Sequence, residues 1–81
     1  MKIVWDEPKR LANIDRHGID FADIGPDFFL SAIIHTAKYG RFAAIGRLDE
    51  VIAVIFATLG TEGVSIISAR AASRKERRVL K

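Results

Sequence analysis

The sequence predicts a single α+β domain over residues 1–81, built on a small antiparallel sheet of about four to five strands. Three observations support this fold class. Apolar residues follow the helical period in the first third of the chain and change to strand-like runs from residue 31 onward. A helix-capping sequence precedes the final, basic segment. We therefore expect N-terminal helices packed on one face of the sheet and a short basic helix at the C-terminal end.

The N-terminal third predicts one short strand and two helical segments. Residues 2–5 contain β-branched and aromatic side chains, which favour a strand. Residues 9–17 carry apolar residues three apart in a polar stretch and are followed by Gly18, so they predict an amphipathic helix with a glycine C-cap. Gly25 and Pro26 interrupt the next helical pattern. We expect that second helix to be kinked or divided.

The middle of the chain predicts a meander of strands at residues 32–36, 41–46, 51–59 and 64–70. The third of these is the most apolar and does not alternate, so both of its faces should be buried. Arg70 has the same strand parity as Val64 and Ile66. Alternation therefore predicts a partly desolvated guanidinium on an apolar face.

The C-terminal segment concentrates positive charge. Six of the 13 Lys and Arg residues lie within residues 70–81, against one acidic residue, Glu76. Ser73 and Glu76 have the spacing of a capping box, so a helix should begin at Arg74. Four cations would lie on one face of this helix, at positions i, i+3, i+4 and i+7: Arg74, Arg77, Arg78 and Lys81. Such a face favours RNA or DNA as a partner. A solvated basic tail is the alternative.

Composition limits the kinds of site and the cellular locations that the chain can have. The chain has no cysteine, which excludes disulfides and thiolate metal sites and fits a cytoplasmic location. The N-terminus lacks a signal-peptide pattern, and the longest apolar run, residues 51–57, is too short to span a membrane. The net charge of +3 permits contact with nucleic acid without requiring it. No phosphate-binding loop or dinucleotide fingerprint is present, and we expect neither a cofactor nor a metal.

Histidines and arginines supply the candidate site residues. His17 ends the first predicted helix, where it can act as an acid or base or simply interact with the helix dipole. His35 lies in an apolar strand and is expected to be a packed strand residue. Arg70 can bind a phosphate through two parallel donors, or it can pair with an Asp or Glu. Arg41 and Arg47 flank a predicted strand and are expected to be solvated.

Two blocks, His-Gly-Ile-Asp-Phe from His17 and Ile-Ser-Ala-Arg ending at Arg70, occur together with Trp5-Asp6, Arg41-Phe42 and the basic C-terminal helix. In this order and spacing the sequence resembles the BrnT-type toxins over nearly the whole chain. The resemblance implies a RelE-like ribonuclease fold. It also implies the toxin component of a type II toxin–antitoxin pair, which inhibits translation by cleaving RNA without a metal.

The same resemblance implies roles and partners. His17, Arg70 and Arg74 would be catalytic, and Arg41 matches the hairpin arginine of the family. Together with the predicted basic stripe, this gives Arg41, Arg77, Arg78 and Lys81 as the expected RNA-binding residues. A ribbon-helix-helix antitoxin would neutralise the toxin, and DNA would be reached only through that antitoxin.

An alternative is a catalytically weak or inactive homologue that binds an antitoxin or nucleic acid. The chain has Lys38-Tyr39-Gly40 where family members carry an acidic residue before the hairpin arginine, which motivates this alternative. We also expect Phe28 and Phe29, beside the helix break, to expose apolar area that the antitoxin covers; the alternative is that they complete the core.

Overall fold

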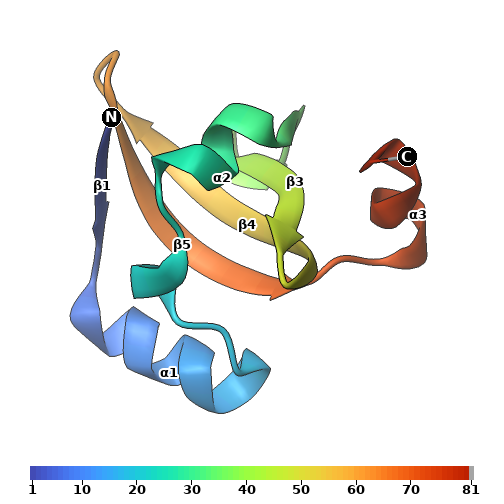
Figure 1. Cartoon of the computed structure of the whole chain (residues 1–81). Helices are drawn as coiled ribbons and strands as arrows, with labels where there is room; N and C mark the ends of the chain where they lie inside the picture. The colour runs from blue at the N-terminus through green and yellow to red at the C-terminus, as the bar shows by residue number, and fades with distance from the viewer. Residues whose placement is uncertain (81) are drawn as a thin grey trace.

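A computed structural model describes residues 1–80, and the expectation for Lys81 lies outside these residues. The N-terminal half contains β1 (Lys2–Trp5), α1 (Glu7–His17), the short 3₁₀ turn η1 (Phe21–Asp23) and α2 (Pro26–Ser31). It is followed by β2 (Ile33–Thr36), the turn η2 (Lys38–Gly40), β3 (Phe42–Leu48), β4 (Glu50–Leu59) and β5 (Gly63–Ala71). The chain ends with α3 (Arg74–Arg77) and the turn η3 (Arg78–Leu80) (Figure 1).

The strands form one five-stranded sheet in the order β1-β5-β4-β3-β2. Strands β2 to β5 pair antiparallel, as the predicted meander requires, whereas β1 pairs parallel with β5. The sheet is therefore mixed, and the predicted α+β class with an N-terminal strand is confirmed. The predicted division of the second helix is also confirmed, because the chain forms η1 and α2 on either side of Ile24 and Gly25. No helix of the described residues is long and apolar enough to cross a membrane.

One face of the sheet carries the main hydrophobic core beneath η1 and α2. Phe21, Phe28 and Phe29 pack there against side chains of the sheet, which include Ile52, Val54, Phe56, Ile66 and Ala69. Phe28 and Phe29 are only 6% and 8% exposed, so the expectation that they offer an apolar partner surface was wrong. The neighbouring Leu30 is the exposed residue, at 80%.

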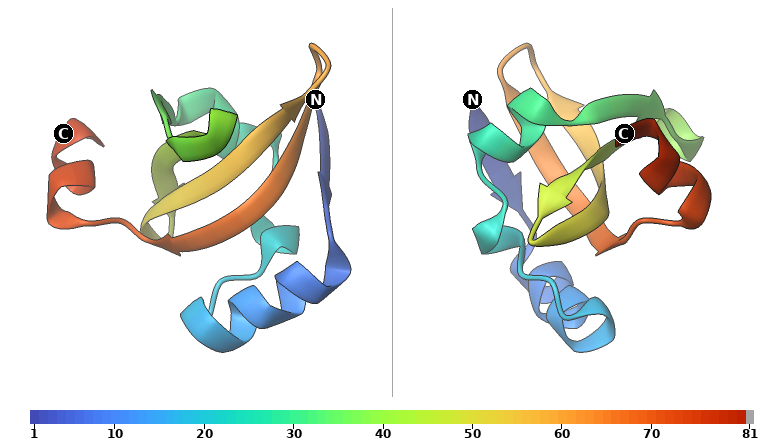
Figure 2. Two further views of the ribbon diagram at one scale, coloured as in Figure 1. Left: turned by 180° about the vertical axis from the view of Figure 1, so that it is seen from behind. Right: turned by 45° about the vertical axis from the view of Figure 1, so that its right-hand side comes forward.

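The opposite face carries a second, smaller cluster beneath the C-terminal segment. Ala43, Ile45 and Ala53 are buried on this face, and Leu80 packs against them. Figures 1 and 2 show α3 standing apart from α1 and α2, beyond the end of β5. Because Ile52 and Val54 face the main core while Ala53 faces the second cluster, the predicted two-sided burial of the central strand is confirmed.

A β-bulge in β5 changes which residues face the core. Ser68 pairs with Ile55 while Ile66 pairs with Phe56, so Ile67 is an extra residue in this strand. An extra residue reverses the alternation beyond it. Arg70 therefore lies on the face opposite to Val64 and Ile66, and the parity argument from the sequence was wrong.

Asn13 fixes α1 against β5 where that strand has no neighbour on its outer side. The pairing of β1 with β5 stops at Trp5 and Ile66. Farther along β5, the Asn13 side chain accepts a hydrogen bond from the Ala69 N–H (3.0 Å) and donates to the Ala69 carbonyl (2.9 Å). It also donates to the Ile19 carbonyl (2.9 Å) and is 6% exposed. One amide side chain thus replaces a missing strand and satisfies buried backbone groups.

We expect Asn13→Ala to destabilise the fold by at least about 2 kcal/mol, because it leaves several buried backbone groups without partners, each costing about 1–3 kcal/mol. Urea unfolding followed by circular dichroism measures the loss. Arg16→Ala, an exposed change on the same helix, should stay within about 0.5 kcal/mol of wild type. Equal stabilities for the two variants would show that the Asn13 hydrogen bonds contribute nothing particular.

Candidate active site

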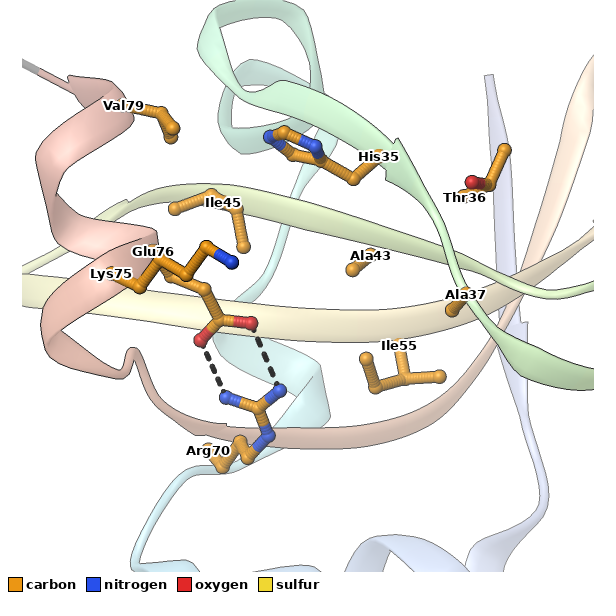
Figure 3. A pocket seen from close by; sticks show the side chains of 10 residues that line it. All are labelled: His35, Thr36, Ala37, Ala43, Ile45, Ile55, Arg70, Lys75, Glu76 and Val79. Carbon is orange, nitrogen blue, oxygen red and sulfur yellow. Dashed lines mark hydrogen bonds and ion pairs between the residues drawn. The ribbon is translucent and has the colours of Figure 1, made fainter.

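A groove of about 320 Å³ opens on the second face of the sheet, between β2 and α3. Ala43, Ile45 and Ile55 form an apolar floor. Polar side chains enter from both sides of this floor: His35 from β2, and Arg70, Lys75 and Glu76 from β5 and α3 (Figure 3). The groove therefore combines an apolar base with a small set of convergent charged groups, which is the usual composition of a binding site.

Arg70 and Glu76 form a two-point ion pair in this groove. Arg70 donates from Nη1 to Oε1 of Glu76 (2.7 Å) and from Nη2 to Oε2 (3.0 Å). The hydrogen bonds from Arg70 hold the pKa of the Glu76 carboxyl at about 2, and the same contact raises the pKa of Arg70. The arginine side chain remains 38% exposed. Of the two interpretations of Arg70 left open by the sequence, the structure shows the pairing with an acidic residue.

The Glu76 carboxylate also caps α3. Its Oε1 atom accepts from the Ser73 N–H (2.8 Å), while the Ser73 hydroxyl accepts from the Glu76 N–H (3.1 Å). The predicted capping box is thus confirmed, and α3 begins at Arg74 as expected. Because one carboxylate holds both the helix start and the Arg70 guanidinium, the position of α3 and the position of Arg70 depend on each other.

The C-terminal segment reaches the groove from both α3 and η3. Glu76 of α3 and Val79 of η3 line the groove, and Leu80 of η3 packs on the sheet. Lys75 reaches the groove from the adjoining position, and Figure 3 shows its amino group projecting over the floor.

The predicted basic stripe lies outside this groove. Arg74, Arg77 and Arg78 are exposed, and none of the three lines it. The regular helix spans only Arg74 to Arg77 before the 3₁₀ turn, so these cations do not share one continuous α-helical face. The catalytic assignment of Arg74 and the RNA-binding assignments of the others stay predictions.

The structure does not place His17 in the groove that Arg70 lines. His17 is exposed at the end of α1 and lines a separate hollow with Lys9, Arg16 and Ser68. Arg41 lies just before β3 and is half-buried, so the expectation that it is solvated was wrong, whereas Arg47 is exposed as expected. The Arg41 carbonyl accepts from the N–H of Ala37, which lines the groove (2.8 Å). The proposed roles of His17 and Arg41 stay predictions.

His35 and Lys75 line the groove, and sequence reasoning assigned neither of them to the site. The outcome for His35 differs from the prediction. It was expected to be a packed strand residue, but it is exposed and lines the groove. The hairpin register pairs it with Ala43, whose side chain lies on the groove face. A usable signal was present: counting back from the predicted turn places His35 and Ala43 opposite each other. Within residues 1–80 no group of three or more His, Cys, Asp or Glu side chains could hold a metal ion.

The lowered pKa of Glu76 predicts a pH-dependent contribution to stability. Because folding lowers this pKa from 4.5, the charged Glu76 carboxylate stabilises the fold above pH 4.5. This contribution to stability is lost as the pH falls toward about 2. We therefore expect Glu76→Gln to be less stable than wild type at pH 7, and the difference to shrink between pH 4.5 and about 2. Urea unfolding at several pH values measures it. Glu62→Gln, an exposed loop change, serves as the control; a Glu76→Gln difference that is the same at every pH would contradict the assignment.

Comparison with known proteins shows which family the chain belongs to. The family model described as "Ribonuclease toxin, BrnT, of type II toxin-antitoxin system" matches residues 5–76. The crystal structure of the Brucella abortus ribonuclease toxin, BrnT, is similar to this chain with a TM-score of 0.84 and 53% sequence identity. The match covers 91% of this chain and 99% of that one. Among curated proteins no sequence matches significantly. The chain therefore belongs to the BrnT family of ribonuclease toxins of type II toxin–antitoxin systems.

Proposed function

We propose that this toxin cleaves single-stranded RNA within the groove between β2 and α3, without a metal ion, and that the cleavage arrests translation. The observation that carries the proposal is the placement of Arg70 and Lys75 over an apolar floor, on a sheet face that α3 covers only in part. Family membership supports the ribonuclease activity. The groove supports its place, because Arg70, Lys75 and an imidazole, His35, line it together.

RNA cleavage through the ribose 2′-hydroxyl needs a base, a group that stabilises charge on the phosphate, and a proton for the leaving oxygen. Arg70 supplies the second requirement, because its guanidinium presents parallel donors to phosphate oxygens. In the structure Glu76 occupies two of these donors. A phosphate would share the guanidinium with Glu76 or displace it, while Lys75 adds a second cation beside the same position.

The cations around the groove would guide the RNA backbone. Arg74 and Arg77 of α3 and Arg78 of η3 add exposed positive charge outside the groove. Arg41 lies next to Ala37, which lines the groove. Lys81 completes this set in the sequence. Such contacts position a strand without reading its bases.

We further propose that a ribbon-helix-helix antitoxin neutralises the toxin, and that the toxin reaches DNA only through this partner. Membership of a type II family supports a cognate antitoxin. A binding module without activity is the second candidate, favoured by the pairing of Arg70 with Glu76, which occupies two of the donors that a phosphate would use.

Replacement of Arg70 tests the activity. We expect Arg70→Ala to lower the rate of RNA cleavage about 100-fold or more, because it removes a preorganised donor to the phosphate. Arg70→Lys keeps the charge but loses the parallel donors, so we expect an intermediate loss. Cleavage of a labelled single-stranded RNA is followed in EDTA, with Arg47→Ala as the matched arginine control. Absence of cleavage by folded wild-type protein would instead support the binding module.

The salt dependence of RNA affinity tests the exposed cations of α3 and η3. We expect the double variant Arg77→Gln and Arg78→Gln to bind a 2′-O-methyl RNA, which cannot be cleaved, more weakly at low salt. The slope of log affinity against log salt should become shallower by up to about 1.4 if both arginines contact phosphates. Gln preserves helix propensity, so folding should change little. A double Gln change at Lys9 and Arg16 is the control; equal slopes for both double variants would place the RNA elsewhere.

A further inference from the structure

His35 is the imidazole among the residues that line the groove. It extends from β2, the edge strand of the sheet, and Figure 3 shows its ring projecting over the groove toward α3. Of the ten side chains drawn there, only Arg70 and Glu76 are joined by hydrogen bonds, so none of the other lining residues holds the ring. The imidazole is available to a bound molecule.

The charged groups that face His35 come from two elements. Arg70 reaches the groove from β5, and Lys75 and Glu76 reach it from α3, whereas β3 and β4 contribute only the apolar floor. An RNA phosphate held by Arg70 and Lys75 would therefore bring its neighbouring ribose over the floor, on the side that β2 borders.

Other titratable groups are less suited to remove a proton there. Glu76 is bound to Arg70 at two points, and its pKa of about 2 makes it a weak base at neutral pH. His17 lines a different hollow, beside α1. An imidazole is the side chain whose ordinary titration range lies closest to neutral pH, which suits it to general base catalysis.

We propose that His35 is the general base of this ribonuclease. The proposal rests on the proposed cleavage of RNA in the groove and names a residue for its first step. The neutral imidazole takes the proton of the ribose 2′-hydroxyl, and the 2′ oxygen forms a bond to the adjacent phosphorus while the bond to the 5′ oxygen breaks. The leaving 5′ oxygen takes a proton from water, and the imidazolium returns its proton to the hydroxide that remains. The products are a 2′,3′-cyclic phosphate and a 5′-hydroxyl.

The test compares wild type with His35→Gln and, as the same change at the rival residue, His17→Gln. We expect His35→Gln to lower kcat/KM for RNA cleavage about 100-fold or more. If an imidazole is the base, the rate of wild type should fall on the acid side of its pH profile, and His35→Gln should lack that fall. His35 is exposed, so the melting temperature should change little. Added imidazole should restore part of the rate in His35→Ala, which a purely structural role does not explain.

A substrate with sulfur in place of the leaving 5′ oxygen separates the base from an acid. Sulfur leaves without a proton, so His35→Gln should stay slow on this substrate, whereas a variant lacking the acid would recover. Full recovery, a loss confined to His17→Gln, or an unchanged pH profile in His35→Gln would overturn the proposal. If Arg70→Ala abolishes cleavage while His35→Gln cleaves normally, the groove stands as the active site and only the role of His35 fails. If wild type and Arg70→Ala behave alike, the proposed function fails, and this inference fails with it.

Discussion

The extra residue at Ile67 is the constraint on which both faces of the molecule depend. Before it, β5 places Val64 and Ile66 in the main core; after it, Ala69 enters that core and Arg70 turns to the opposite face. Without the bulge, strict alternation would direct Arg70 into the hydrocarbon core, where an unpaired guanidinium is very costly. Asn13 holds the strand just beyond this point through both backbone groups of Ala69. The position of Arg70 in the groove therefore depends in part on the hydrogen bonds that Asn13 makes at the outer edge of β5.

The ion pair between Arg70 and Glu76 connects structure with function. A partly exposed pair contributes little stability by itself. This one also caps α3 through Ser73, so its carboxylate determines where the C-terminal helix over the second face begins. The arrangement keeps the guanidinium in a fixed orientation in the free protein. It also means that RNA must compete with a good intramolecular partner, so binding and the position of α3 should be coupled.

Local sequence rules predicted most of the elements, because short-range signals determine them. The capping box of Ser73 and Glu76, the left-handed Gly18 and the break at Gly25 act within a few residues, and each is found as expected. Strand positions followed from apolar runs. The face of Arg70 could not be predicted, because a bulge depends on pairing with Ile55 and Phe56, which lie more than ten residues away. The exposure of Leu30 rather than Phe28 likewise depends on how α2 rotates onto the sheet.

The two histidines show why the site is harder to predict than the fold. His17 belongs to the sequence block that carries the family resemblance, whereas His35 lies in a short apolar strand with no distinctive neighbours. In the folded structure, however, it is His35 that lines the groove and His17 that lies outside it. The edge strand β2 borders the groove, and Lys75 and Glu76 enter it from the C-terminal segment. The first helix packs instead against β5, which β4 and β3 separate from β2. The hairpin register could place His35 opposite Ala43, but its meeting with Lys75 and Glu76 depends on the strand order and on where α3 lies.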